Sequence, residues 1–299
     1  MFYTVTLNPA MDYVITANGM KPGRVNRSTA EELHVGGKGI NVSIVLKELG
    51  IGSKALGFTA GFTGEEIEKR VAAMGVEPDF VRLKTGCSRI NVKIRSDRET
   101  ELNGQGPDIS PQAQEQLFAK LDSIKDGDTL ILAGSVPASL SPDIYGRILL
   151  RLADRKVRVV VDATKELLWN ALPYKPFLIK PNRHELEELF GIPLPTQEAV
   201  LEYAAQLRSM GAANVLVSLA DEGALLLDEN GRTHIGKACR GRVINSVAAG
   251  DSMVAGFLAG ASEGDYEYAL KLGTAAGGAT AFSEGLAKRE EIQRLLEQL

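Results

Sequence analysis

DTLILAG at residues 128–134 is the first of four short apolar runs that determine the fold class. The others follow at residues 157–163 (VRVVVDA), 176–182 (PFLIKPN) and 214–220 (NVLVSLA). Runs this short and this uniformly apolar are typical of strands buried on both faces of a parallel sheet. Helical patterns separate them, around residues 142–154, 183–190 and 196–210. Strands that alternate with helices predict a doubly wound α/β fold, with helices on both faces of a mostly parallel sheet.

Two segments, residues 11–35 and 88–103, lack this alternation of strands and helices. The second of them alternates apolar and polar residues around an Asp-rich centre, which predicts an antiparallel hairpin. Residues 38–49 show apolar side chains at helical spacing, and residues 251–299 are mostly helical in pattern. We therefore expect one domain over residues 1–299, with the two segments forming a small inserted β unit.

The composition is that of a globular protein and excludes several classes. The 299 residues include 34 Lys plus Arg and 38 Asp plus Glu, which gives a formal net charge of −4. Apolar residues make up 44%, enough to bury against the entropy of ordering, so a disordered chain is excluded. The acidic balance argues against a nucleic-acid partner, and no apolar run reaches the roughly 18 residues of a membrane span. Two scattered cysteines and three scattered histidines predict neither a disulfide framework nor a zinc site, so we expect a cytoplasmic protein.

The first cluster that could carry chemistry is His34-Val-Gly-Gly-Lys-Gly-Ile-Asn41. Gly36, Gly37 and Gly39 surround Lys38 immediately before a predicted helix. The N–H groups at a helix start can bind an anion or a polyol oxygen, with the lysine helping. The cluster is not a P-loop, because glycine follows the Gly-Lys pair. A strand-to-helix turn with a solvated lysine is an equally good interpretation.

The second cluster, Asn245-Ser-Val-Ala-Ala-Gly-Asp-Ser252, is a loop of small residues at another helix start. Such a loop can surround a developing phosphoryl charge with N–H donors. Asp251 at its edge could accept a hydroxyl proton. The simpler alternative is that Asp251 only caps the helix.

The third cluster, Lys180-Pro-Asn-Arg-His-Glu185, follows the apolar run that ends at residue 179. Residues beyond the carboxyl ends of parallel strands face the ligand crevice. Asn182 and Glu185 lie three apart on the opening turn of a helix, so both could face one Mg²⁺ ion. The same pair also fits a helix capping box, and that alternative is at least as good.

The fourth cluster is Ser218-Leu-Ala-Asp-Glu-Gly223, again at a strand end. A turn of small residues there could hold a nucleotide phosphate, although by itself it is an ordinary turn.

Arg89 and Asn91 occupy alternate positions of the predicted hairpin and therefore project to one face. Together with Asp12, Arg27 and Lys38 they offer cations for a phosphate and a carboxylate for sugar hydroxyls. The alternative is a solvated strand face.

In this order, the four clusters resemble the ribokinase-like carbohydrate kinases of the phosphofructokinase B family. GGKGINVS (36–43) and AAGDSMVAGF (248–257) are similar to the family's two signatures, and KPNRHE (180–185) to its N-x-x-E element. TVTLNPAMDY (4–13), VNRS (25–28) and TGCSRINVKI (85–94) resemble the branch that phosphorylates sugar phosphates. The likeness covers essentially the whole chain. It implies a three-layer ribokinase-like fold with a small β lid.

The resemblance also implies a reaction, in which the γ-phosphoryl group of ATP passes to a sugar hydroxyl. Asp251 would accept the hydroxyl proton, and the N–H groups of Ala248, Ala249 and Gly250 would form the anion hole. The sugar phosphate would be bound by Asp12, Arg27, Gly36, Gly37, Lys38, Asn41, Arg89, Asn91 and Asp251. ATP would be bound by Lys180, Asn182, Ser218, Ala220, Glu222, Gly223, Ala249 and Gly250, and Mg²⁺ by Asn182 and Glu185.

The wording of the motifs is closest to members that phosphorylate fructose 1-phosphate at the 6-hydroxyl. Tagatose 6-phosphate is the alternative substrate. In relatives the lid excludes water and pairs two subunits, so the resemblance implies a homodimer.

The chain departs from the family pattern at Ala248 and Ala220, where glycine is usual. If Ala248 adopts a positive φ, its Cβ strains the loop by about 1–2 kcal/mol. We expect reduced but real activity, because alanine keeps the backbone N–H. The departures leave open a regulator that binds sugar phosphate without catalysis, although Asp251, Asn182 and Glu185 argue against it. A nicotinamide dehydrogenase is weaker still, since the G-x-G-x-x-G turn is absent.

Overall fold

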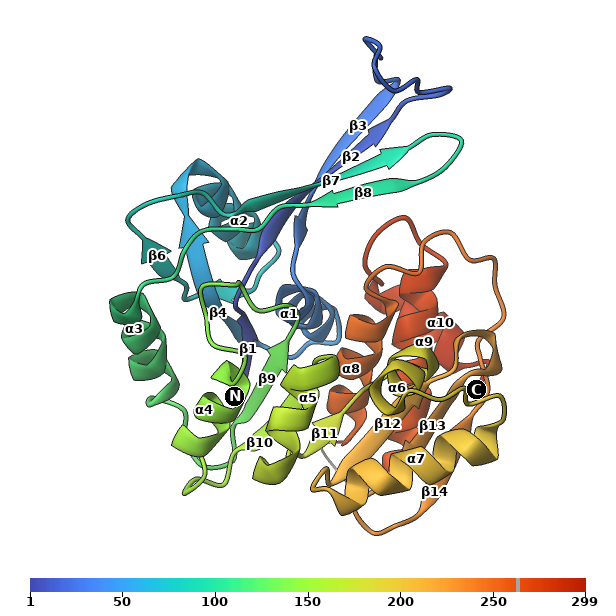
Figure 1. Ribbon diagram of the computed structural model, residues 1–299. Helices are drawn as coiled ribbons and strands as arrows, with labels where there is room; N and C mark the ends of the chain where they lie inside the picture. Colours follow the sequence, from blue (N-terminus) through green and yellow to red (C-terminus); the bar gives the residue numbers. More distant parts are fainter. Residues whose placement is uncertain (262–263) are drawn as a thin grey trace.

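The architecture is seen in a computed structural model, in which residues 1–261 and 264–299 are described. A 10-stranded sheet runs through the molecule in the order β14-β13-β12-β11-β10-β9-β1-β4-β5, with β6 paired to β4 (Figure 1). Its strands are β1 (Phe2–Thr6), β4 (Ser53–Ala60), β5 (Glu77–Pro78), β6 (Val81–Leu83), β9 (Thr129–Ala133), β10 (Arg158–Asp162), β11 (Leu178–Ile179), β12 (Asn214–Ser218), β13 (Ala224–Leu227) and β14 (Thr233–Gly236).

The four apolar runs at residues 128–134, 157–163, 176–182 and 214–220 form four adjacent strands of this sheet, as predicted. β9, β10, β11 and β12 pair in parallel, and their apolar side chains are buried on both faces. β13 and β14 are antiparallel additions at one edge. β11 is much shorter than its run because Pro176 and Pro181 flank it, and proline has no N–H for the ladder.

Helices cover both faces of the sheet, which confirms the predicted three layers. One layer contains α3 (Pro111–Leu121), α4 (Ile144–Arg151), α5 (Lys165–Ala171), α6 (Arg183–Phe190) and α7 (Gln197–Ser209). The other contains α1 (Lys38–Glu48), α8 (Ala249–Gly260), α9 (Tyr266–Ala281) and α10 (Arg289–Leu296). α2 (Gly61–Ala73) packs against α1 in a third cluster of apolar side chains. Short 3₁₀ turns occur at η1 (Leu172–Tyr174) and η2 (Ala220–Glu222).

The predicted helical region at residues 251–299 consists of α8, α9 and α10, while residues 262–263 within it lie outside the described part. α8 and α9 pack closely through glycines. A Cβ on Gly256 of α8 would lie 2.5 Å from the carbonyl oxygen of Leu272 in α9. None of the helices in the described residues has the length and hydropathy needed to span a membrane.

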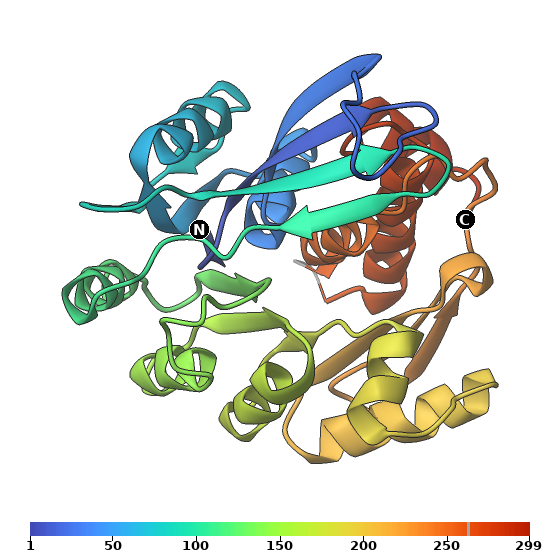
Figure 2. The same ribbon diagram turned by 45° about the horizontal axis from the view of Figure 1, so that its top comes forward.

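A second, 4-stranded sheet stands off the main body in the order β3-β2-β7-β8 (Figures 1 and 2). Its strands are β2 (Ala10–Thr16), β3 (Ala30–Gly36), β7 (Arg89–Arg95) and β8 (Thr100–Asn103). β7 and β8 are antiparallel, as predicted for residues 88–103, and β2 and β7 pair in parallel. The sheet rises from the carboxyl end of β1, so it lies on the side where the parallel strands end.

Candidate functional site

The buried carboxylate of Asp251 joins two predicted clusters that are far apart in the sequence. Asp251 lies in the first turn of α8 and is 4% exposed. Its Oδ2 accepts a hydrogen bond of 2.8 Å from Nδ2 of Asn41, which lies in the first turns of α1. The first and second clusters therefore meet at the carboxyl edge of the main sheet, as the resemblance implied. Asp251 is not the helix N-cap, because Ala248 holds that position.

Asp162 is a central residue that the sequence analysis missed. It ends β10, is 1% exposed, and accepts a hydrogen bond of 3.2 Å from Nζ of Lys38. Nζ of Lys180 lies 3.8 Å from the other carboxylate oxygen. The signal was present in VRVVVDA, because residues at the ends of parallel strands face the crevice. Asp162 ends β10 as Lys180 follows β11, so the same position in the sheet indicates both residues.

The two aspartates have opposite pKa shifts. Burial and the charge of Asp162 raise the pKa of Asp251 to about 7, against the opposing effects of Lys38, the Asn41 amide and Lys180. Burial also opposes ionisation of Asp162, but Lys180 and Lys38 outweigh it and lower the pKa of that carboxyl. The pKa of Lys38 is raised, since the carboxylates of Asp162, Asp251 and Glu185 outweigh its burial. The site thus holds one carboxyl whose pKa is lowered beside one whose pKa lies near neutrality, which is where a proton acceptor is most effective.

A cavity of about 830 Å³ opens beside this cluster. It lies between the turn after β12, the start of α8 and the loop before it, and Phe282 and Val243 form part of its apolar wall. All eight residues predicted to bind the nucleotide line it, namely Lys180, Asn182, Ser218, Ala220, Glu222, Gly223, Ala249 and Gly250. Glu222 is held by Arg183, whose two terminal nitrogens lie 2.5 and 2.7 Å from its carboxylate oxygens.

Asn182 and Glu185 form a helix capping box, which was one of the two interpretations of this pair in the sequence; the other was a metal site. Asn182 Oδ1 accepts from the N–H of Glu185 at 2.8 Å, and Glu185 Oε2 accepts from the N–H of Asn182 at 2.9 Å. Within residues 1–261 and 264–299 no three His, Cys, Asp or Glu side chains are grouped to hold a metal. Mg²⁺ commonly uses one or two protein oxygens together with substrate phosphates and water. The free lone pairs of this pair fit that mode of binding at the edge of the cavity.

Asp12 and Asn91 project from neighbouring strands of the second sheet and face the same side. Asn91 Nδ2 donates to Asp12 Oδ1 at 2.8 Å, and Nζ of Lys93, two residues further along β7, lies 3.6 Å from Asp12 Oδ2. A Cβ on Gly36 would lie 2.7 Å from Asp12 Oδ1, so only glycine allows this approach. Lys93 was not predicted as a site residue, although it lies two residues after Asn91 in the strand and therefore projects to the same face of the sheet.

Arg89 extends from the base of this sheet toward the ends of β1 and β9. Its Nε donates to the carbonyl oxygen of Asn8 at 3.0 Å, and its Nη2 lies 3.4 Å from Oγ of Ser135. The glycines before α1 serve partly to bring the chain close to β1. A Cβ on Gly37, whose φ is 136°, would lie 2.7 Å from Thr6 Cγ2.

Arg27 is a predicted site residue that the structure does not bring to the others. It is exposed in the loop between β2 and β3, at the far end of the second sheet (Figure 1). Among the described residues its side chain pairs with no carboxylate. Within a single chain it is therefore separated from Lys38 and Arg89.

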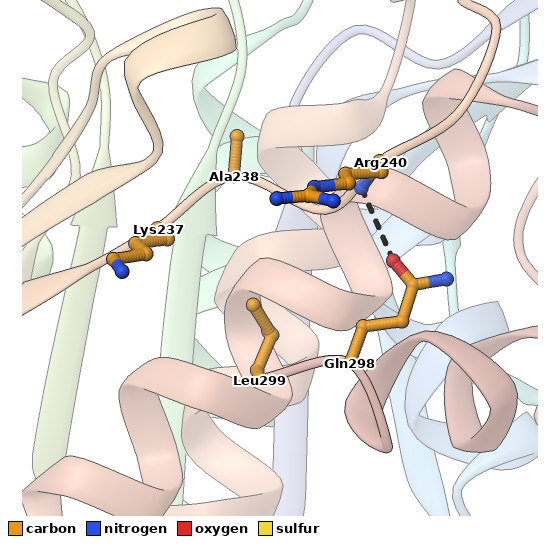
Figure 3. A pocket seen from close by; sticks show the side chains of 5 residues that line it. All are labelled: Lys237, Ala238, Arg240, Gln298 and Leu299. Atoms are coloured by element: carbon orange, nitrogen blue, oxygen red, sulfur yellow. Dashed lines mark hydrogen bonds between the residues drawn. The ribbon is translucent and has the colours of Figure 1, made fainter.

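A second cavity of about 490 Å³ adjoins the first and shares only Ala238 with it (Figure 3). It is lined by Lys237, Ala238, Arg240, Gln298 and Leu299. The backbone N–H of Arg240 donates to Gln298 Oε1 at 3.1 Å, which fixes the loop to the end of the chain described here. None of the predicted site residues lines it.

Comparison with known proteins gives a consistent set of relatives. Residues 5–292 match the family described as pfkB family carbohydrate kinase. A protein named 1-phosphofructokinase from Bacillus subtilis (strain 168) is 45% identical, over 100% of this chain and 98% of that protein. A D-tagatose-1-phosphate kinase from Bacillus licheniformis is 36% identical, over 100% of this chain and 98% of that protein.

Solved structures agree in fold. A putative phosphofructokinase from Staphylococcus aureus has a TM-score of 0.88 at 41% identity, covering 100% of this chain and 97% of that one. Phosphofructokinase-2 from Escherichia coli in complex with substrates and products has a TM-score of 0.93 at 27% identity, covering 100% and 99%.

Ala248 and Ala220 both adopt the left-handed conformation, with φ of 63° and 52°. The positive φ of Ala248 therefore strains the loop of the predicted anion hole, as expected for a residue with a Cβ. We expect Ala248→Gly to raise the free energy of unfolding by about 0.5–1 kcal/mol, because relief of the Cβ clash exceeds the added backbone entropy. Turnover of a sugar phosphate should rise as well. Urea unfolding and steady-state kinetics measure the two effects.

Lys175→Gly is the matched control for this variant. Lys175 has φ of 54° at the exposed end of η1, remote from the site, so the change should stabilise the protein with turnover unaltered. Unchanged turnover in Ala248→Gly would show that the methyl group is harmless to the reaction.

Proposed function

This chain belongs to the pfkB family of carbohydrate kinases, and from this premise we propose that it transfers the γ-phosphoryl group of ATP to the 6-hydroxyl of fructose 1-phosphate. The product would be fructose 1,6-bisphosphate. The observation that carries the proposal is the buried Asp251 carboxyl, which lies near Lys38 and directly follows Ala249 and Gly250 of the 830 Å³ cavity. Relatives named 1-phosphofructokinase support the choice of substrate.

Asp251 is the proton acceptor in this proposal. Its carboxylate takes the proton of the sugar hydroxyl as the oxygen attacks the γ-phosphorus, and the bond from phosphorus to the leaving oxygen of ADP breaks in line. Asn41 holds the carboxylate in position through its 2.8 Å hydrogen bond. Phosphoryl transfer depends mainly on such positioning and on charge stabilisation.

The N–H groups of Ala248, Ala249 and Gly250 form the proposed anion hole. They lie at the N-terminus of α8, where the helix dipole favours negative charge, and the N–H of Ala249 donates to the carbonyl oxygen of Ser246 at 3.3 Å. A Cβ on Gly250 would lie 2.9 Å from Nζ of Lys180, so the ammonium group lies directly against this turn. Asn182 and Glu185 would hold Mg²⁺, which when bound neutralises phosphate charge.

The second sheet carries the proposed sugar contacts. Asp12 and Asn91 would accept and donate hydrogen bonds to sugar hydroxyls, and Gly36 and Gly37 allow the chain to approach the ring. Lys38 and Arg89 would bind the phosphate that the sugar already carries, because a doubly charged group needs more than one cation. Closing this sheet over the body would exclude water, so we propose that it is the lid.

We also propose that the lid pairs two subunits. Cross-strand register places Leu33, Tyr13, Val92 and Leu102 in one row, on the face opposite Asp12 and Asn91. Leu33 and Leu102 are 41% and 62% exposed. An exposed apolar row of this kind marks an interaction surface. Such pairing would bring the lid tip, with Arg27, close to a second copy.

Two other functions remain as candidates. The D-tagatose-1-phosphate kinase relative favours tagatose 1-phosphate as a second substrate, and tagatose 6-phosphate is the alternative from the sequence. A regulator that binds sugar phosphate without turnover is motivated only by Ala248 and Ala220. A proton acceptor with a pKa near 7 argues against the regulator, since binding alone does not need one.

A coupled assay of ADP release across four sugar phosphates tests the proposal. We expect the highest kcat/KM with fructose 1-phosphate, followed by tagatose 1-phosphate, and much lower values with fructose 6-phosphate and tagatose 6-phosphate. A preference for either 6-phosphate would reverse the assignment of the phosphate-binding end. No turnover with any of the four would favour the regulator.

The pH dependence of kcat/KM follows from the raised pKa of Asp251 in the free protein. Below pH 7 this carboxyl holds a proton and cannot accept another, so kcat/KM should fall about tenfold per pH unit below a midpoint near 7 and be level above it. Asp251→Asn should lower kcat by ~10² or more and abolish this dependence while ATP still binds. Near-normal turnover in that variant would mean that the proton goes elsewhere.

Leu102→Asp should convert the dimer to a monomer, because a charge in the apolar row would be buried without a partner. Sedimentation equilibrium should give twice the chain mass for the wild type and one chain mass for the variant. Ile235→Asp is the control, since Ile235 is 61% exposed on β14, away from the lid. A wild-type monomer, or a dimer that survives Leu102→Asp, would contradict pairing through this row.

A further inference from the structure

Asp162 occupies the point where the sugar side and the nucleotide side of the site meet. Lys38, on the sugar side, donates to both of its oxygens at 3.3 and 3.2 Å. Lys180, which lines the nucleotide cavity, places its Nζ 3.8 Å from Oδ1. A single carboxylate at the end of β10 thus contacts the cations on both sides of the transfer path.

Although burial opposes ionisation of Asp162, the charges of Lys180 and Lys38 lower the pKa of its carboxyl. Lys180 is 4% exposed and Asp251 is 4% exposed, so neither charge is screened by water as on the surface. The groups that face Asp251 are Lys38 and Asn41 from α1, Asp162 from β10 and Lys180 from the end of β11. In the described residues no cation lies within 4.0 Å of the Asp251 carboxylate, whereas Asp162 has two.

We propose that Asp162 is a positioning residue for phosphoryl transfer: it fixes Lys38 and Lys180 on opposite sides of the reacting groups and serves as their counter-ion in place of Asp251. The proposal rests on the proposed kinase function. If the Asp251 carboxylate were paired with two ammonium groups, it would accept a proton poorly, because the positive charges would stabilise its ionised form. The lysines contact Asp162 rather than Asp251, whose carboxyl interacts with the Asn41 amide and with Asp162 itself, and the negative charge of Asp162 adds to burial in raising the pKa of Asp251.

Two consequences follow when the charge of Asp162 is removed. The lysines lose their common partner and turn toward Asp251, the nearest remaining carboxylate. Their positions at the sugar phosphate and at the anion hole are then lost. A misplacement of about 1 Å can cost about 10²-fold in rate.

The first test is Asp162→Asn, assayed with fructose 1-phosphate, ATP and Mg²⁺. We expect kcat to fall about 10²-fold, with a change in KM of less than about tenfold. The acid midpoint of kcat/KM should move down by about one pH unit or more, since the neighbouring negative charge is gone and the lysines face Asp251. A merely structural role would lower the amount of folded enzyme and leave the midpoint near 7.

Asp228→Asn is the matched control. Asp228 is also 1% exposed, but it binds His234 and two backbone N–H groups in the β13–β14 turn, remote from the site. Its variant should keep both kcat and the acid midpoint. An acid midpoint that moves equally in both variants would overturn the proposal. So would an unmoved midpoint in Asp162→Asn accompanied by a tenfold higher Mg²⁺ requirement, which would assign Asp162 to metal binding.

Asp162→Glu keeps the charge and covers the case in which Asp162→Asn does not fold. Its carboxylate is one methylene further out, so we expect an acid midpoint near that of the wild type with kcat reduced at least tenfold, because both ammonium groups shift. Wild-type kcat in this variant would contradict the positioning role.

A readout independent of turnover separates this proposal from the proposed function. Asp162 raises the pKa of Lys38, so its loss increases the neutral fraction of that amine. Trace labelling with acetic anhydride, followed by mass spectrometry, should show Lys38 reacting several-fold faster in Asp162→Asn than in the wild type or in Asp228→Asn. Equal labelling would refute the contact even in an active enzyme, whereas faster labelling in a protein that phosphorylates no sugar would refute only the kinase function.

Discussion

The site depends on bringing two lysines and two aspartates together, with Asp162, Lys180 and Asp251 buried and Lys38 partly exposed. Buried charges are costly unless each has a partner, so the four side chains must be delivered to fixed positions by rigid elements. The parallel strands β10 and β11 deliver Asp162 and Lys180, and the first turns of α1 and α8 deliver Lys38 and Asp251. The alternation of strands and helices therefore brings these four side chains to one place at the carboxyl edge of the sheet.

Two of the strained backbone positions lie at this site. The non-glycine residues with positive φ in the described chain are Lys165, Lys175, Ala220 and Ala248. Ala220 lines the nucleotide cavity, and Ala248 is the N-cap of α8, whose first residues Ala249 and Gly250 line it too. Strain of this kind persists only where surrounding contacts enforce it, and it gathers at sites where the backbone itself binds. Here the packing of α8 against α9 provides that enforcement.

Much of this arrangement could be predicted from the sequence. The apolar runs identified the central strands, the hairpin at 88–103 formed, and the residues expected at the nucleotide line one cavity. The sequence did not indicate a role for Asp162 or Lys93, because each is a single charged residue, Asp162 in an apolar strand and Lys93 in an alternating one. The residues that face them across the sheet are set by strand register, which sequence distance does not give. The sequence allowed two interpretations of Asn182 and Glu185, because residues three apart at a helix start can form a capping box and can also bind one metal ion. The position of Arg27 depends on a long hairpin, whose direction no local pattern specifies.

The central claim is that Asp251 meets the acceptor oxygen of the sugar. A crystal structure with fructose 1-phosphate and an ATP analogue that cannot transfer its phosphoryl group measures this directly. The account predicts that the 6-hydroxyl oxygen lies about 2.6–3.2 Å from a carboxylate oxygen of Asp251 and faces the γ-phosphorus. A 6-hydroxyl nearer to another side chain, with Asp251 turned toward the lysines, would contradict it.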